Sequence, residues 1–177
     1  MCRQHWPGSV CSAASMVENR FPPLPGSYLL WLFLPRGVEI EVGRFGCRHF
    51  KRGWYFYSGS AFGPGGLRAR LGRHLRASER RHWHIDYFKE QARIRAVWLC
   101  RGVNLEHDWS HRLLQLPDAE LPVAGFGSSD CACPSHLVYL PTRPDSATMI
   151  KILAGEQRIE RYNVSAAGLF ACQLCRS

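Results

Sequence analysis

Long apolar runs, an excess of acidic residues and a leader-like N-terminus are all missing from this chain of 177 residues. No hydrophobic stretch approaches the roughly 20 residues that a membrane-spanning helix needs, and the best candidate, residues 28–34, ends at Pro35. The N-terminus lacks the basic and then apolar order of a secretory signal. We therefore expect a cytoplasmic protein without a membrane partner, whose eight cysteines are thiols or metal ligands rather than disulfides.

The shortage of acidic residues makes the chain strongly basic, with 23 Lys and Arg against 14 Asp and Glu, a net charge of +9 and a pI of about 9.5. Basic domains tend to bind polyanions, because neutralising phosphates releases counterions and supplies affinity that is independent of sequence. Arginines and histidines crowd the segment 68–84. We expect a nucleic-acid partner, DNA rather than RNA, and name as phosphate contacts Arg68, Arg73, Arg76, His82 and His84.

The length and the 46% hydrophobic content fit one domain with a real core. We expect an N-terminal tail over 1–25, a domain over 26–142 and a C-terminal extension over 143–177. Hydrophobic periodicity predicts strands at 28–34, 38–42, 53–59 and 94–100, with a short strand ending at 139; it predicts helices from Leu67, over 84–92, and from a cap at Asn104 to Leu114.

Three strands in succession favour an antiparallel meander as the start of the domain. The helices that follow would cover the sheet. The sequence therefore predicts a small α/β domain, with a central, mainly antiparallel sheet flanked by helices.

Four short motifs lie on these predicted strands and helices, one after another along the chain. Gly26-Ser27-Tyr28 opens the first strand and Tyr57-Ser58-Gly59 ends a later one. Arg70 and His74 are spaced as Arg-x-x-x-His on the first helix, and Glu106 lies in the first turn of a later helix. This ordered set resembles the GIY-YIG endonuclease superfamily. The stretches 59–68, 82–87 and 125–131 are similar to a little-characterised prokaryotic branch, whose members occur alone or fused to an endonuclease III-type glycosylase.

The resemblance implies a metal-dependent endonuclease that hydrolyses phosphodiester bonds in DNA, with a role in repair. It implies that Glu106 holds one Mg²⁺ or Mn²⁺ ion, that Arg70 contacts the scissile phosphate, and that Tyr28, Tyr57 and His74 complete the catalytic set, with Tyr28 favoured to orient or deprotonate the water. A hard cation accepts a single carboxylate because it keeps several waters. The segment between the two tyrosines is longer than in the family, which predicts an inserted hairpin around residues 38–50.

Two other functions stay open. The chain can be a nucleic-acid-binding module that kept the fold without hydrolysis. It can also be a zinc-stapled interaction module, if Cys131, Cys133 and His136 converge with a fourth ligand. Cys172-x-x-Cys175 and His82-x-His84 are further candidate metal pairs. We prefer His82 and His84 as phosphate contacts or as packing around Asp86, and do not favour structural zinc.

Overall fold

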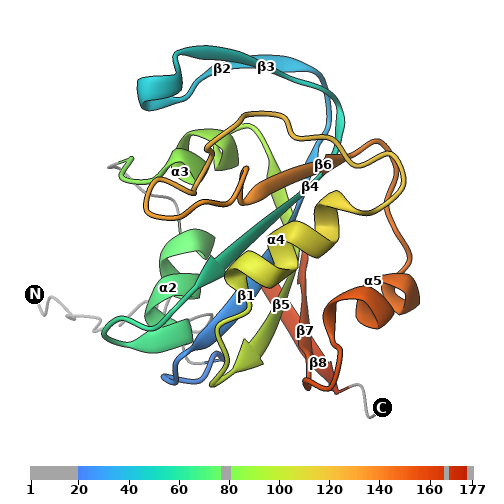
Figure 1. Cartoon of the computed structure of the whole chain (residues 1–177). Helices are drawn as coiled ribbons and strands as arrows, with labels where there is room; N and C mark the ends of the chain where they lie inside the picture. Colours follow the sequence, from blue (N-terminus) through green and yellow to red (C-terminus); the bar gives the residue numbers. More distant parts are fainter. Residues whose placement is uncertain (1–19, 77–80, 166–167, 175–177) are drawn as a thin grey trace, which may run out of the picture.

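A central antiparallel sheet organises the part of the chain that the computed structural model describes, which is residues 20–76, 81–165 and 168–174 (Figure 1). Its six strands there run in the order β6-β4-β1-β5-β7-β8. The strands, together with a separate two-stranded hairpin β2-β3, are β1 (Gly26–Leu34), β2 (Val38–Glu41), β3 (Cys47–Phe50), β4 (Gly53–Ser60), β5 (Arg93–Arg101), β6 (Leu137–Leu140), β7 (Glu160–Ser165) and β8 (Gly168–Leu174). The helices are η1, a short 3-10 helix (Gly43–Phe45), α2 (Gly66–Leu75), α3 (His84–Lys89), α4 (Glu106–Leu114) and α5 (Ser146–Leu153). The expected fold class, an α/β domain with an antiparallel sheet flanked by helices, is confirmed.

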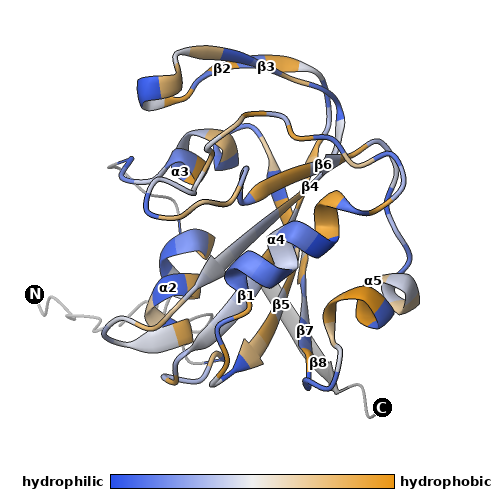
Figure 2. Ribbon diagram, in the orientation of Figure 1, coloured by the Kyte–Doolittle hydropathy of each residue, from blue (hydrophilic) through white to orange (hydrophobic). Residues whose placement is uncertain are grey.

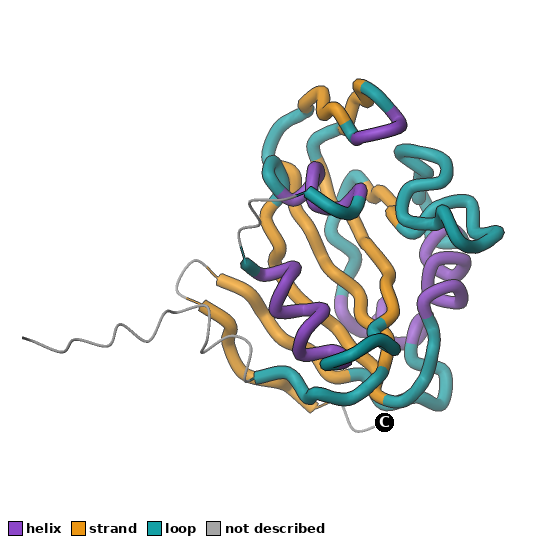
Figure 3. The backbone as a smooth tube through the Cα atoms, turned by 90° about the vertical axis from the view of Figure 1, so that its left-hand side faces the viewer, coloured by secondary structure: helices purple, strands orange, loops and turns teal. Residues whose placement is uncertain are grey.

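β1 is apolar on both faces because it lies at the centre of the sheet, between β4 and β5, and is covered from both sides. Side chains of alternating residues point to opposite faces of a strand. Leu30 and Leu32 therefore join the core under α2 and α3, whereas Leu29 and Trp31 join the core under α4 and α5. Figure 3 shows α2 crossing the face of the sheet that is turned toward the viewer.

The two helices on the second face differ in polarity. In Figure 2 the ribbon of α5 is mostly apolar, while α4 begins with polar residues. Trp109 and Leu113 are the buried side of α4, so its polar start is left to face the neighbouring loop and β4. None of the helices in the described residues is long and apolar enough to cross a membrane.

The expected three-strand meander is wrong. β2 and β3 pair with each other and not with the sheet, and β1 pairs directly with β4, with Leu34 opposite Gly53. Both edges of β1 are taken by β4 and β5, so no edge remains for β2. The inserted hairpin around 38–50 is present.

The end segments add to the same sheet. From the segment 143–177, which we expected as an extension of the domain, come α5 and the strands β7 and β8, with β7 paired to β5. From the tail 1–25 the structure describes residues 20–25, of which Phe21 is buried with its ring centroid 5.0 Å from that of Tyr162.

The helices start within one residue of their predicted positions, although the N-cap of α4 is Leu105 rather than the predicted Asn104, and one helix end differs more. α2 begins one residue before Leu67, and the Oδ1 atom of Asn104 accepts a hydrogen bond from the Glu106 amide at 3.4 Å at the start of α4. α3 ends at Lys89, where the sequence predicted a helix to residue 92.

Candidate functional site

A pocket of about 450 Å³ opens where β4, α2, the start of α4 and two loops meet. Three of the expected catalytic residues line it from three different elements: Tyr57 from β4, Arg70 from α2 and Glu106 from α4. The expected phosphate contacts His82 and His84 also line it. The remaining lining residues are Arg44, Ser60, Trp83, Gly127, Ser129 and Asp130.

Tyr28 and His74 lie behind this pocket rather than on its wall. Their side chains are buried, and the Tyr28 hydroxyl lies 2.8 Å from Nε2 of His74. Burial raises the pKa of Tyr28 well above its ordinary value. Burial, followed by the nearby Lys89 charge, lowers the pKa of His74 to about 3, so the imidazole is neutral near pH 7. The His74 ring also packs against the Tyr57 ring, so these two buried residues support the part of the pocket lining that Tyr57 forms.

Gly59 explains why the second motif needs a glycine. Tyr28 and Gly59 are direct partners in the β1–β4 register. A Cβ atom at position 59 would overlap the Cζ and hydroxyl of Tyr28 and would lie only 2.9 Å from its Cε2. Without a side chain at Gly59, the aromatic ring can lie across the neighbouring strand and reach His74.

We expect Gly59→Ala to destabilise the fold by about 1–3 kcal/mol, the usual cost of an overpacked core. In a Tyr28→Ala background the same substitution should cost almost nothing, because the ring that it strikes is gone. Denaturant titration of the four proteins of this cycle measures the coupling. Gly63→Ala is the control, since nothing lies within 4 Å of a Cβ atom there. An equal cost for Gly59→Ala in both backgrounds would show that the Tyr28 ring is not the obstacle.

Arg70 is held over the indole ring of Trp83. The guanidinium carbon of Arg70 lies 4.4 Å from the ring centroid, and that of Arg73 lies 3.6 Å from it. The buried Asp86 fixes this group, because its Oδ2 accepts hydrogen bonds from the Trp83 amide at 3.0 Å and from Nη2 of Arg73 at 3.1 Å. Although burial raises the pKa of Asp86, hydrogen bonds from the Trp83 and His82 amides and the Lys89 charge hold it below its ordinary value. Arg70 thus reaches the pocket from a rigid support.

The arginine-rich segment is divided by the fold. Arg68 donates from Nε to the Phe21 carbonyl at 3.0 Å, and Arg73 is paired with Asp86, so neither lines the pocket. Arg76 is exposed at the C-terminal end of α2, also away from the pocket lining. Arg81 is paired with Glu90 at 2.6 Å. Of the described arginines expected to bind phosphate or to act in catalysis, the pocket receives only Arg70.

The Glu106 side chain contacts both the pocket and a buried histidine behind it. This side chain, 16% exposed, lines the pocket, and its Oε1 atom lies 3.2 Å from Nδ1 of His136. Burial raises the pKa of Glu106, but its polar contacts with His136 and Ser60 outweigh burial and lower the pKa below the ordinary value. The carboxylate is therefore ionised at neutral pH.

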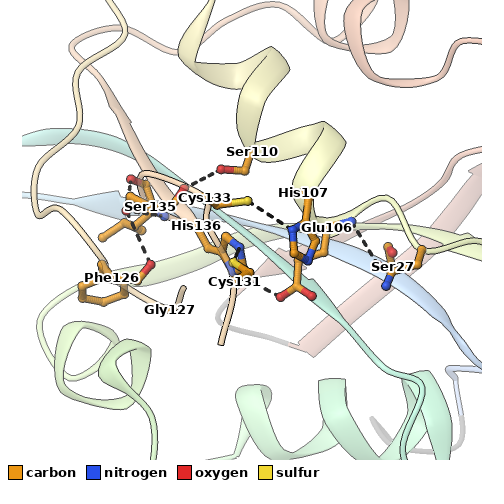
Figure 4. Close-up of polar contacts among 12 residues, drawn as sticks. Ser27, Glu106, His107, Ser110, Phe126, Gly127, Cys131, Cys133, Ser135 and His136 are labelled. Carbon is orange, nitrogen blue, oxygen red and sulfur yellow. Dashed lines mark hydrogen bonds and ion pairs between the residues drawn. The ribbon is translucent and has the colours of Figure 1, made fainter. Parts of the chain in front are cut away.

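A cluster able to hold a metal ion lies directly behind Glu106. One ligand atom from each of His107, Cys131, Cys133 and His136 lies within 4.8 Å of all the others. Cys131 Sγ is 3.3 Å from Nε2 of His136, and Cys133 Sγ is 3.2 Å from Nδ1 of His107. Figure 4 shows Glu106 and His107 together at the start of α4, facing the loop that carries the two cysteines.

Three members of this cluster, Cys131, Cys133 and His136, are candidate ligands from the sequence, and the fourth, His107, was missed. His107 is far from Cys131 along the chain and was hidden beside Glu106, the residue that carried the family motif. Structural zinc was not favoured from the sequence, where it required Cys131, Cys133 and His136 to converge with a fourth ligand; His107 is the residue that meets them. The side chains of Cys172 and Cys175 lie outside the described residues. His82 and His84 line the pocket, where burial and then the Arg44 charge lower the pKa of His84.

Arg44 and Trp83 were also missed. Arg44 comes from η1 in the inserted hairpin, where no local signal marks a pocket residue. Trp83 lies between the two histidines that we named, and its role as a platform for Arg70 depends on the Asp86 contacts. Asp130 belongs to the stretch 125–131 that carried the family resemblance, which was the signal available for it.

The family model of the domain of unknown function DUF123 matches residues 27–158. The chain belongs to the DUF123 family. The match runs from β1 through α5, and so contains the pocket and the His107, Cys131, Cys133 and His136 cluster of this DUF123 domain, while β7 and β8 follow it. No curated protein and no solved structure matches the chain.

Proposed function

We propose that this DUF123 domain is a divalent-metal-dependent endonuclease that hydrolyses phosphodiester bonds in DNA. The observation that carries the proposal is the meeting of Tyr57, Arg70 and Glu106 in one pocket, from three elements far apart in sequence. A cytoplasmic setting and a role in DNA repair belong to the same proposal and rest on the sequence resemblance to GIY-YIG nucleases.

Glu106 fits the role of metal ligand. Its carboxylate is ionised and lines the pocket, and Asp130 brings a second carboxylate to the pocket lining. Oxygen ligands of this kind suit Mg²⁺ or Mn²⁺, which when bound supplies Lewis-acid stabilisation to a phosphate undergoing attack.

Arg70 contacts the substrate in this proposal. A guanidinium offers two parallel donors that match two phosphate oxygens, and the Trp83 indole lies 4.4 Å beneath the guanidinium carbon. His82 and His84 extend the phosphate-binding wall.

Tyr57 takes the position next to the attacking water, in place of Tyr28. Tyr57 lines the pocket, whereas the Tyr28 hydroxyl is bonded to His74 in the core. Burial and then the Glu106 charge raise the pKa of Tyr57 above its ordinary value, while Arg70 lowers it. Its phenol is therefore protonated and donates a hydrogen bond that orients the water.

A second candidate is a nucleic-acid-binding module without hydrolysis, and one observation favours it. The Glu106 carboxylate already contacts His136 and Ser60. If those contacts are its whole role, the pocket retains its arginines and histidines for phosphate and has no metal ligand in Glu106.

A substrate panel decides between these candidates. Branched, flapped, nicked and single-stranded DNA should be incubated with the full chain in Mg²⁺, in Mn²⁺, in Ca²⁺ and without a divalent ion. We expect cleavage of at least one structure in Mg²⁺ or Mn²⁺ and none without a divalent ion, together with binding that weakens steeply as salt rises. DNA binding in Ca²⁺ without cleavage of any substrate in Mg²⁺ or Mn²⁺ would establish the binding module. DNA affinity that does not change with salt concentration would argue against binding through contacts between basic side chains and phosphates.

A further inference from the structure

We propose that His107, Cys131, Cys133 and His136 bind one Zn²⁺ ion, and that Glu106 orients His136 toward it. This inference stands apart from the nuclease proposal, since it concerns ligands that do not line the pocket and a metal of different chemistry.

The spacing of the four atoms fits a tetrahedral ion. Zinc lies about 2.3 Å from a thiolate sulfur and about 2.0–2.1 Å from an imidazole nitrogen, so a tetrahedral site separates sulfur from nitrogen by roughly 3.6 Å. The two sulfur–nitrogen distances here are 3.3 and 3.2 Å, and all four atoms lie within 4.8 Å of one another. These two sulfur–nitrogen pairs lie within a few tenths of an ångström of the tetrahedral separation, so an ion can be placed between them with small side-chain movements.

The donor set selects the metal. Two sulfurs and two imidazole nitrogens suit Zn²⁺, whereas Mg²⁺ and Ca²⁺ prefer oxygen ligands. Four protein ligands close the coordination sphere, which is the arrangement of structural rather than catalytic zinc. The cysteines are free thiols, and Cys133 and His136 are buried, so the site is shielded from solvent on that side.

Glu106 supplies the outer contact that zinc-bound histidines commonly have. A ligating imidazole binds the metal through one nitrogen and usually gives the other to a carboxylate. Nε2 of His136 faces Cys131, and Nδ1, a buried atom without a well-aligned hydrogen-bond partner, lies 3.2 Å from the Glu106 carboxylate. Glu106 is thus a positioning residue for the metal site, with His136 1% exposed between them.

The site joins the start of α4 to the loop 121–136. That loop contains turns and bends but neither a helix nor a strand, and its residues Gly127, Ser129 and Asp130 line the pocket. A zinc ion would cross-link it to α4, in addition to the hydrogen bond that the Ser110 hydroxyl of α4 donates to the Ser135 carbonyl of the loop.

Metal content tests the proposal directly. The full chain, purified without chelator and dialysed into zinc-free buffer, should carry about one zinc ion per molecule by elemental analysis. Cys131→Ser/Cys133→Ser should carry almost none, and His107→Ala should lose zinc to a chelator far faster than the wild type. Cys47→Ser and His111→Ala are the matched controls, because Cys47 is exposed in the hairpin and His111 is exposed one turn further along α4. Both controls should keep their zinc.

The absorption spectrum of the cobalt-substituted wild-type protein reports which atoms bind the metal, and it does not depend on the folding of any variant. Wild-type protein stripped of zinc and loaded with Co²⁺ should show the intense visible bands of a tetrahedral site and a thiolate-to-cobalt charge-transfer band in the near ultraviolet. Glu106→Gln should keep these bands but bind zinc about 10–100-fold more weakly, as expected for an outer-shell partner.

Three outcomes would overturn the assignment. The first is wild-type protein that contains no zinc as purified and takes up none on titration. The second is full zinc content in the Cys131→Ser/Cys133→Ser protein, and the third is a cobalt spectrum without thiolate bands. Zinc content is independent of turnover, so a zinc-loaded protein that cuts no DNA would refute the nuclease proposal and leave the metal site standing.

Discussion

Replacing Glu106 by alanine is expected to abolish Mg²⁺-dependent cleavage while DNA binding stays intact or becomes slightly tighter. Removing a carboxylate from a pocket that also holds Arg44 and Arg70 reduces the repulsion of phosphate. Losing the cation that Glu106 holds removes several kcal/mol of Lewis-acid stabilisation, which corresponds to a fall in rate of at least about 10³-fold.

Arg70→Ala should also stop cleavage, but it should weaken binding, because this guanidinium contacts the substrate. The pair therefore predicts opposite changes in affinity with the same loss of turnover. Cleavage assays in Mg²⁺ and binding titrations in Ca²⁺ measure the two effects separately.

Asp108→Ala is the matched control for Glu106→Ala. It removes a carboxylate from the same turn of α4, but Asp108 is paired with Arg112 at 2.9 Å and does not line the pocket. It should cut at the wild-type rate. Zinc content is measured on the same preparations, so that loss of the outer contact to His136 is separated from loss of the catalytic cation. A Glu106→Ala protein that cuts as fast as the wild type would show that Glu106 is not the metal ligand.

The stability of the fold is expected to fall steeply as the pH drops below about 6.5, because His74 is buried as a neutral imidazole. In the unfolded chain a histidine takes up a proton near pH 6.5, whereas burial and Lys89 lower the pKa of His74 in the folded protein to about 3. Between these values the unfolded state binds more protons, so stability rises with pH. The contribution of His74 is complete above pH 6.5 and is lost progressively toward pH 3, with a total on the order of 5 kcal/mol.

His74→Gln removes this titration while keeping a polar partner for the Tyr28 hydroxyl. Urea titrations at pH 7.0, 5.5 and 4.5 should give a smaller loss for the variant than for the wild type, with a difference of roughly 3 kcal/mol between the ends of that range. His111→Gln should show the same dependence of the free energy of unfolding on pH as the wild type, since His111 is exposed.

Asp86 contributes at lower pH, because its depressed pKa gives stability that is lost only below about pH 4. If the free energy of unfolding fell equally with pH in His74→Gln and in the wild type, His74 would not titrate in this way.

The sequence predicted what is encoded locally. Periodicity located β1, β4, α2 and α4 because each has a clear apolar pattern of its own. The motif order placed Tyr57, Arg70 and Glu106 in one site, since the family resemblance carried the long-range information that periodicity lacks.

What depends on pairing between distant segments was missed. Alternation in β2 marks a strand but not its partner, so the hairpin was mistaken for part of a meander. Tyr28 was favoured over Tyr57 for the water because no local signal tells which strand aromatic faces the pocket and which is covered by His74. His107 became a metal-ligand candidate only when α4 and the cysteine loop were seen side by side.

The inserted hairpin also bears on how this fold can change in evolution. Leu34 and Gly53 face each other at the ends of β1 and β4, so a tight turn of about two residues would suffice to join the strands. The segment between them, residues 35–52, can therefore be gained or lost without re-pairing any strand of the sheet. The segment nevertheless contributes to the core, because Ile40, Val42 and Phe50 are buried in it with Phe50 against Phe88, and it brings Arg44 to the pocket. A chain that lost the hairpin would keep every strand pairing of the central sheet, but it would uncover part of this core and lose Arg44 from the pocket.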